Sequence, residues 1–324
     1  DLQLNIREEA EAPPSLRAVM RNDPVLQSRF SFSLPVLQWA GSWSRSSWTQ
    51  LKDRAPPYSW KGLPVSVTPL VIFLLISKTN ASQAPSCKQM LLTDSPGRCV
   101  RCAVVGNGGI LRGAGQGRNI DGHDLVFRMN GAVIWGFEED VGTKVSFYGF
   151  TTNTLSWYRP DGFAGVPQGP DIKFIFIPSE TRCWRRRGRL GQNETESSGL
   201  DKVLYKPWKY FGHKPPESFR MLHPQFISYL MHSLLTSPLM TDSLARDLYM
   251  PSTMLLTALH TCDQVSAYGF ITRNYADFSD HYYDSVPRPL RFFANHDLQM
   301  EGGLWEALHR RGVLRLFQRG RGRG

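Results

Sequence analysis

The sequence has no hydrophobic run long enough to cross a membrane. Its longest apolar stretch, Leu70–Ile76, follows Pro69 and is far shorter than the ~20 residues that a membrane-spanning helix requires. We interpret this stretch as a buried strand or a short core helix. The chain also lacks an initiator methionine and a signal peptide, so we expect a fragment or a processed form.

Cysteine is scarce, with five residues in 324. Cys99-x-x-Cys102 is half of a common zinc-binding pattern, but no second CxxC supplies the other ligands, so a structural zinc site is disfavoured. An odd number of cysteines leaves at least one thiol unpaired if the others are oxidised. Glycosylation sequons at Asn80 and Asn193 lie in polar, loop-like sequence and favour a protein of the secretory pathway, where disulfides form.

The chain does not have enough acidic residues to balance its basic ones, and its net charge is +10. This charge favours an acidic partner such as nucleic acid, an anionic membrane surface or an anionic sugar nucleotide. Basic residues cluster at Arg182–Arg189 and Arg319–Arg323. No basic stripe is interleaved with aromatic residues, so nucleic acid is the weaker interpretation.

The chain divides into segments that differ in amino-acid composition and hydrophobic periodicity. Residues 1–60 mix charge, proline, serine and tryptophan without a sustained period, which predicts a largely irregular stem. Residues 61–98 are a lead-in, residues 99–318 form the globular domain, and residues 319–324 are a basic tail. The polar, basic stretch Thr181–Pro216 is predicted to be a long surface loop.

Short apolar runs separated by glycine-rich turns begin near Cys99 and predict buried strands. The predicted strands are Ala103–Val105, Leu125–Met129, Val145–Phe150, Ile172–Ile177, Val265–Phe270 and Leu290–Ala294. The predicted helices are Phe226–Leu235, Met254–Thr261 and Glu301–Arg311. Strands that alternate with helices predict an α/β fold, with a mostly parallel sheet flanked by helices.

A glycine-rich turn, Gly106-x-Gly108, follows the first predicted strand. Such a strand–turn–helix pattern presents backbone N–H groups to a phosphate, although a lone glycine-rich turn is usually only a tight turn. A nicotinamide-binding turn would have Gly or Ala where Leu111 stands and an acidic residue where Asn130 stands, so an oxidoreductase is disfavoured. Asn107 and Asn130 both follow strands, which places them at the ligand-binding edge of a parallel sheet.

Four segments, in the same order along the chain, resemble the conserved motifs of eukaryotic sialyltransferases. They are Arg101–Thr143 (large motif), Leu259–Phe270 (small motif), His281–Asp284 (motif III) and His296–Glu301 (very small motif). The resemblance runs from about Cys99 to Gln318, which makes residues 99–318 the expected catalytic domain. Segments such as Ser146–Phe150 resemble the subgroup that acts on GalNAc O-linked to Ser or Thr, its type 2 members more than its type 1 members.

The resemblance implies a GT-A-like variant of the Rossmann fold and an inverting transfer of sialic acid. The donor would be CMP-sialic acid, and the acceptor the 6-hydroxyl of GalNAc on mucin-type glycoproteins. By family position, His296 would be the general base and His281 a donor near the phosphate. The chain has no Asp-x-Asp and the donor has one phosphate, so we expect no metal and no cofactor. The resemblance also implies the Golgi lumen and an N-terminal membrane anchor absent from this chain.

The resemblance further assigns binding and bridging residues. The implied donor-binding residues are Asn107, Gly108, Asn130, Ser252, Thr253, Gly269 and Phe270. Cys102 and Cys262 match the two family cysteines that join the large and small motifs. Cys87 and Cys99 would then form the second pair and leave Cys183 free.

The chain departs from the family pattern at one place. The family has Pro-Ser-Thr-Gly before the small-motif helix, whereas Pro251-Ser-Thr253 runs directly into Met254 and the glycine and its neighbours are absent. In the family this loop touches the nucleotide, so Ser252 and Thr253 match its pattern less closely than Asn107 does. An alternative function is therefore a catalytically impaired, sialyltransferase-like protein that binds a glycan or a nucleotide.

Overall fold

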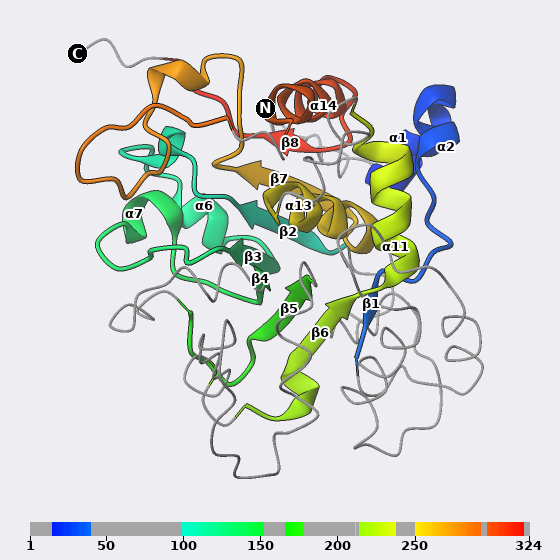
Figure 1. The fold of residues 1–324 in the computed structure, drawn as a ribbon, viewed down its shortest axis with the longest axis horizontal. Coiled ribbons are helices and arrows are strands. Elements are labelled where there is room, and N and C mark those ends of the chain that lie inside the picture. The colour runs from blue at the N-terminus through cyan, green and yellow to red at the C-terminus, as the bar shows by residue number, and fades with distance from the viewer. Residues whose placement is uncertain are drawn as a thin grey trace, which may run out of the picture.

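The chain folds around a twisted, mostly parallel sheet. The computed structural model describes residues 15–39, 99–151, 166–177, 211, 214–237, 250–292 and 297–320. Within them the strand order is β1-β6-β5-β4-β3-β2-β7-β8, and only β1 is antiparallel to its neighbour (Figure 1). The strands are β1 (Leu37–Gln38), β2 (Arg101–Val105), β3 (Leu125–Met129), β4 (Phe147–Thr151), β5 (Lys173–Ile177), β6 (Phe219–Leu222), β7 (Gln264–Tyr268) and β8 (Arg315–Leu316).

Helices cover both faces of this sheet. The helices are α1 (Leu16–Asn22), α2 (Pro24–Arg29), α6 (Gly117–Asp121), α7 (Glu138–Val141), α11 (Pro224–Tyr229), α13 (Met250–Thr261) and α14 (Leu298–Arg310), and a π-helical turn, η6 (Leu230–Leu234), continues α11. No helix of the described residues is long and apolar enough to span a membrane. The predicted α/β class with a mostly parallel sheet is confirmed.

Strand β2 lies at the point where the chain changes direction across the sheet. β2 pairs with β3 on one side, with Val104 opposite Phe127, and with β7 on the other, with Val105 opposite Tyr268. The chain continues from β3 to β6 along one side and then returns to add β7 and β8 on the other. Open parallel sheets bind ligands at the carboxyl ends of the strands beside such a switch point.

Hydrophobic clusters cover both faces of the sheet, because side chains alternate along each strand. Cys102 and Val104 of β2 face the larger cluster, which contains α13. Ala103 and Val105 face the smaller cluster, to which α6 contributes Ile120 and α7 contributes a buried valine. Helix α13 contacts β2, β3, β4 and β7 and lies across the middle of the sheet (Figure 1).

The expected irregular stem contains ordered structure in its described part, which corrects that prediction. Helix α1 begins after Ser15, whose Oγ accepts from Ala18 N, and α2 begins after Asp23, whose carboxylate accepts from Val25 N and Leu26 N. Leu16 and Met20 are four residues apart, so both point from one side of α1 into the large core. Apolar spacing and capping therefore outweigh the mixed composition. The rest of residues 1–60 lies outside the described residues.

The structure differs from the predicted secondary structure in three other respects. No strand forms at residues 290–292, where Arg291 and Phe292 are exposed, and residues 293–294 lie outside the described residues. Pro289 has no backbone N–H to donate to a neighbouring strand, and the exposed side chains bury no apolar face against the core. The prediction also omitted β1, β6 and β8. Helix α13 begins at Met250 rather than at Met254, so it includes the expected Pro251–Thr253 loop.

Candidate active site

A backbone cradle forms where β2 and β7 end side by side. Gly106 N donates to Tyr268 O at 2.8 Å, and Gly108 N donates to Gly269 O at 3.0 Å. Gly109 N donates to Ser279 O at 3.1 Å. These three N–H groups are therefore used inside the protein, so the phosphate-facing backbone donors expected of this turn do not come from them. These hydrogen bonds fix the turn after β2 against the turn after β7.

The cradle requires glycine for steric reasons. A Cβ atom on Gly106 would lie 2.7 Å from Gly269 O, and one on Gly108 would lie 2.6 Å from the same oxygen. Gly269 has φ +70 and its own Cβ would lie 2.6 Å from Gly106 O. Only glycine allows this backbone conformation and this close approach together. Phe270, which follows, is buried in the large core.

Asn107 and Asn130 lie at the same edge, as predicted. Asn107 Nδ2 donates to the Asn130 carbonyl at 3.2 Å and lies 3.5 Å from the Met129 carbonyl, which ties the turn after β2 to the end of β3. Asn107 Oδ1 is buried without a hydrogen-bond partner in the described part of the chain. Asn130 has φ 51, a left-handed conformation that asparagine tolerates better than most residues. The Asn107 amide thus has one free acceptor at the ligand-binding edge.

His281 is held directly against the cradle. Gly108 and His281 form an isolated antiparallel bridge, and Tyr282 N donates to Asn107 O at 3.0 Å. Tyr282 is fully buried, and its hydroxyl donates a hydrogen bond to Val133 O at 2.6 Å. The structure therefore brings together Asn107, Gly108, Gly269 and His281. Sequence reasoning did not single out Tyr282, although its place in the His-Tyr-Tyr-Asp motif was a usable signal.

Two carboxylates face the His281 ring. Its Nδ1 lies 3.6 Å from Asp280 Oδ2 and 3.8 Å from Asp284 Oδ1, and the ring stacks on Tyr283 at 5.0 Å. Burial raises the pKa of Asp280. Burial alone would also raise the pKa of Asp284, but hydrogen bonds from Ser279 Oγ and His281 N outweigh it, so this pKa is lowered. The hydrogen bonds on Asp284 thus favour its charged form, whereas burial disfavours the charged form of Asp280.

Ser252 and Thr253 do not lie in a loop. Both are fully buried in the first turns of α13, and Ser252 Oγ donates to Glu301 Oε2 on α14. Burial raises the pKa of Glu301 to about 8, and the charge of Asp297 adds to this rise. The expected Pro251–Thr253 loop is therefore part of a buried helix, which continues through this segment without a glycine to break it. That Ser252 and Thr253 bind the donor stays a prediction.

Several predicted site residues lie outside the described residues. These are His296, Asn80, Asn193 and Cys87. The neighbour of His296, Asp297, caps α14 by accepting from Met300 N at 3.0 Å and from Ser237 Oγ at 2.6 Å. The predicted general base therefore directly precedes a capped helix that carries Glu301. Its role stays a prediction.

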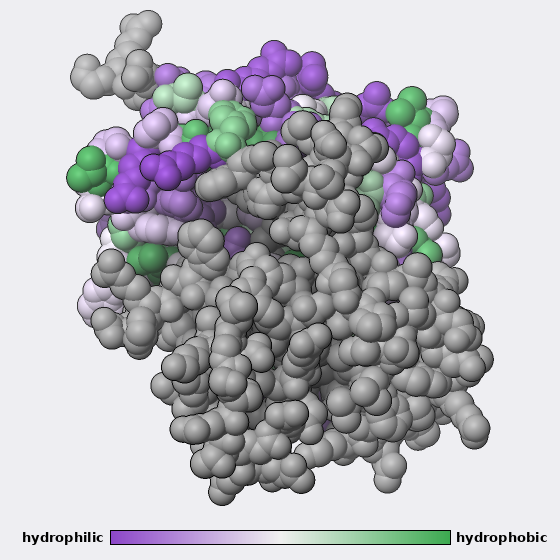
Figure 2. All heavy atoms as spheres, viewed as in Figure 1, coloured by the Kyte–Doolittle hydropathy of each residue, from purple (hydrophilic) through white to green (hydrophobic). Residues whose placement is uncertain are grey.

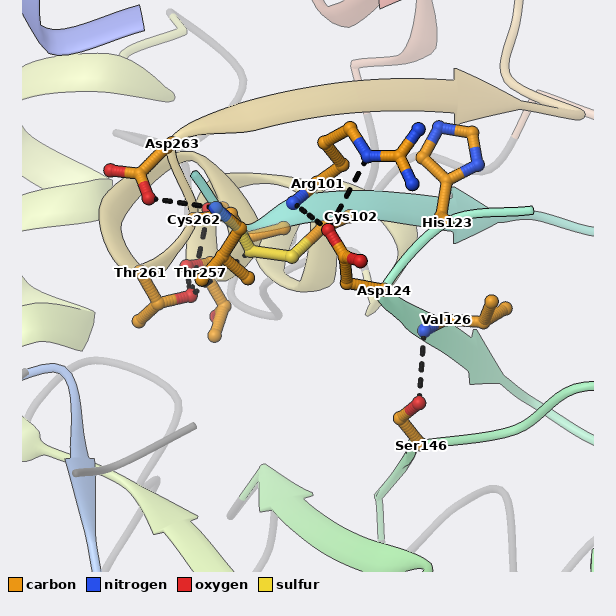
Figure 3. Close-up of a disulfide and its surroundings, with 12 residues drawn as sticks. Arg101, Cys102, His123, Asp124, Val126, Ser146, Thr257, Thr261, Cys262 and Asp263 are labelled. Carbon is orange, nitrogen blue, oxygen red and sulfur yellow. Dashed lines mark hydrogen bonds and ion pairs between the residues drawn. A yellow bond between two sulfur atoms is a disulfide. The ribbon is translucent and has the colours of Figure 1, made fainter. Parts of the chain in front are cut away.

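The structure contains the Cys102–Cys262 disulfide, which joins β2 to the residue after α13 (Figure 3). Around it, Asp263 accepts from Val100 N at 2.9 Å and Asp124 accepts from Arg101 N at 2.9 Å. Cys99, in contrast, is an exposed free thiol, which differs from the expected Cys87–Cys99 bridge. Cys99 precedes β2 outside the core, and nothing in the described residues brings a second thiol to it.

The described residues contain no group of three or more His, Cys, Asp or Glu side chains that could hold a metal ion. That the reaction needs no metal stays a prediction.

Figure 2 shows the molecule from the side of Figure 1. The described residues along its upper rim are mainly hydrophilic, with scattered hydrophobic residues between them. The exposed large hydrophobic side chains of the described residues are Trp135, Val286, Val25 and Phe292.

The fold and the site define an α/β protein with a ligand cradle at the switch point of a parallel sheet. The model of glycosyltransferase family 29 (sialyltransferase) matches residues 38–313. The chain therefore belongs to this family, and the predicted family is confirmed.

Curated relatives agree with this membership, and a solved structure shares the fold. The chain is 50% identical to human alpha-N-acetylgalactosaminide alpha-2,6-sialyltransferase 2, over 94% of this chain and 82% of the relative. It is 38% identical to the human type 1 enzyme, over 95% of this chain and 52% of that relative. A crystal structure of a mammalian sialyltransferase has a TM-score of 0.64 at 24% identity and covers 94% of this chain and 96% of that one, which shows the shared fold.

Proposed function

We propose that this protein transfers sialic acid from CMP-sialic acid to the 6-hydroxyl of GalNAc O-linked to Ser or Thr. The observation that carries the proposal is the cradle with His281 against it, in a chain that is 50% identical to a relative named for that activity. A second solved sialyltransferase, with a TM-score of 0.63, is in complex with Gal-beta-1-3GalNAc-ortho-nitrophenol. We propose O-glycosylated glycoproteins as acceptors and the Golgi lumen as the compartment.

The reaction that fits these residues is a single displacement with inversion at the sialic acid carbon. The acceptor hydroxyl loses its proton to His296, the new glycosidic bond forms, and CMP leaves with the bonding electrons. Asp280 and Asp284 face Nδ1 of His281, which leaves Nε2 of the same ring to donate to the departing phosphate. The Asn107 amide lies at the same edge, and its free Oδ1 can accept a hydrogen bond from a hydroxyl or N–H group of the donor. A leaving group with one phosphate needs no divalent cation in this scheme.

The test is turnover of the whole chain with CMP-sialic acid and a synthetic GalNAc-peptide, with linkage analysis of the product. We expect an α2,6 product and activity that survives excess EDTA. His296→Ala should lower kcat by at least ~10²-fold, the usual contribution of a general base. Complete loss in EDTA that manganese restores, or near-normal kcat in His296→Ala, would contradict the respective assignment.

One observation favours a second function, a sialyltransferase-like protein that binds without turnover. The Ser252 hydroxyl, expected to face the donor, is fully buried and bonded to Glu301. The same assay separates the two functions, because the impaired protein would bind CMP in calorimetry and form no product. The GalNAc-peptide and its Gal-GalNAc and sialylated forms should be compared as acceptors.

A further inference from the structure

The start of the basic C-terminal segment is tied to the loops around the active site. Arg319 Nη1 donates to the Arg112 carbonyl at 3.0 Å. Its guanidinium carbon lies 5.3 Å from the centre of the Phe278 ring, a cation–π contact. Its own carbonyl accepts from Asn274 Nδ2 at 2.9 Å. Residue 319 therefore has three fixed partners, although the sequence predicted that a basic tail begins there.

Arg112 continues this chain of contacts toward His281. Arg112 follows the short helix η2 (Gly109–Leu111), which begins in the cradle, and its Nη1 donates to the Asp284 carbonyl. The backbone of Arg112 is thus held by Arg319, and its side chain holds Asp284. Arg319 therefore holds Arg112, and Arg112 holds Asp284, so two arginines that are distant in sequence together fix one turn.

Asp284 organises the turn that carries His281. Its Oδ2 accepts from His281 N at 2.9 Å and from Ser279 Oγ at 2.7 Å, while Oδ1 faces the His281 ring at 3.8 Å. A shift of Asp284 would therefore move both the backbone N–H and the ring of His281. The same turn bridges to Gly108, so the movement would reach the cradle.

We propose that Arg112 and Arg319 are positioning residues for His281. They fix the backbone of Asp284, and through it the imidazole, against Gly108. The proposal rests on the proposed function, because it needs His281 to act in the transfer. The contacts of both arginines lead to Asp284 and not to a substrate-facing group, so we expect the effect of each to be on the alignment of His281.

The two arginines should differ in how well lysine replaces them. Arg112 makes one hydrogen bond to a carbonyl, which a lysine ammonium can also make. Arg319 combines an Nη1 hydrogen bond with a planar contact on Phe278, and a lysine cannot do both at once. Lysine at 112 should therefore restore most of the activity that alanine removes, and lysine at 319 should restore little.

The experiment compares Arg112→Ala, Arg112→Lys, Arg319→Ala and Arg319→Lys with a matched control, Arg310→Ala. Arg310 is an exposed arginine of α14 whose Nε lies 3.9 Å from Glu306 Oε1. Each alanine variant at 112 or 319 should lower kcat about tenfold, as expected for one charge-assisted hydrogen bond. KM for both substrates should change less than kcat, and the control should behave as the wild type.

Hydrogen exchange of the His281 amide gives a readout that does not depend on turnover. Because Asp284 Oδ2 protects this amide, exchange should accelerate in both alanine variants and in neither the control nor Arg112→Lys. Unchanged exchange and unchanged kcat in both alanine variants would overturn the proposal. If the wild type forms no product, the proposed function fails, and exchange alone then decides whether the arginines hold the turn.

Discussion

The cradle and the start of α13 lie at the same edge of the sheet, but they differ in what fixes them. In the cradle, Gly106, Gly108 and Gly269 are fixed by backbone hydrogen bonds that no side chain can replace. At the start of α13, a side-chain contact between the buried Ser252 and Glu301 joins the segment to α14. A short sequence motif is enough to predict geometry that backbone hydrogen bonds fix, as in the cradle. The geometry at the start of α13 also depends on the number of residues in the segment around Pro251–Thr253.

One covalent bond connects the two regions. Cys102 lies on β2, which leads into the cradle, and Cys262 follows the last residue of α13. The far end of α13 is therefore fixed to the sheet. Any change in the length of the Pro251–Thr253 segment must be taken up at the start of the helix rather than at its end. Four changes test this contrast, and they are ordered by expected effect.

Removal of the bridge, by Cys102→Ala with Cys262→Ala, should have the largest effect. The bond closes a loop with a sequence separation of 160, and its loss should lower the free energy of unfolding by about 5 kcal/mol in the loop-entropy model. Urea unfolding measures the change, with Cys99→Ala as the control because Cys99 is an exposed free thiol. A loss below about 1 kcal/mol would show that the bridge does not tie the two regions together.

The second change concerns the buried Glu301 carboxyl, whose pKa is raised from 4.5 to about 8 by burial. A raised pKa means that the folded state keeps a proton that the unfolded state loses above pH 4.5. Stability is therefore fully present below that pH and declines as pH rises to about 8, by at most about 1.4 kcal/mol per pH unit. Glu301→Gln should remove this slope in urea titrations at several pH values. Parallel curves for both proteins would contradict the buried, protonated state.

The sequence predicted most of the sheet and the turns of the cradle, because these features are determined by residues that are close together in the sequence. Continuous apolar runs made β2, β3 and β7 recognisable, and the glycines and Asn107 marked the turns that follow them. The short strands β1, β6 and β8, of which β1 and β8 form the sheet edges, were not predicted, because they contain only two to four residues and depend on a neighbour for pairing. The Ser252–Glu301 contact was not predicted either, since it joins two helices that are distant in sequence.

The third change, Gly269→Ala, tests the steric side of the cradle. The added Cβ would lie 2.6 Å from Gly106 O at a φ of +70, so we expect a loss of about 1–3 kcal/mol and a drop in CMP affinity. Gly303→Ala is the matched control, because that glycine lies in α14 with nothing within 4 Å of a new Cβ. Alanine there should stabilise the helix by up to about 1 kcal/mol. Equal effects at both sites would mean that the cradle tolerates side chains.

The last change restores the missing segment by inserting Gly-Ala-Leu after Thr253. Since Cys262 holds the end of α13, the insertion displaces the helix start by roughly 4–5 Å and frees Ser252 from Glu301. We expect CMP affinity and turnover to rise several-fold, about 1 kcal/mol in binding free energy. An Ala-Ala-Ala insertion at the same place adds the length without the glycine, so it should restore less. If neither insertion changes CMP affinity or turnover, the shortened segment is tolerated and the position of Ser252 does not limit donor binding.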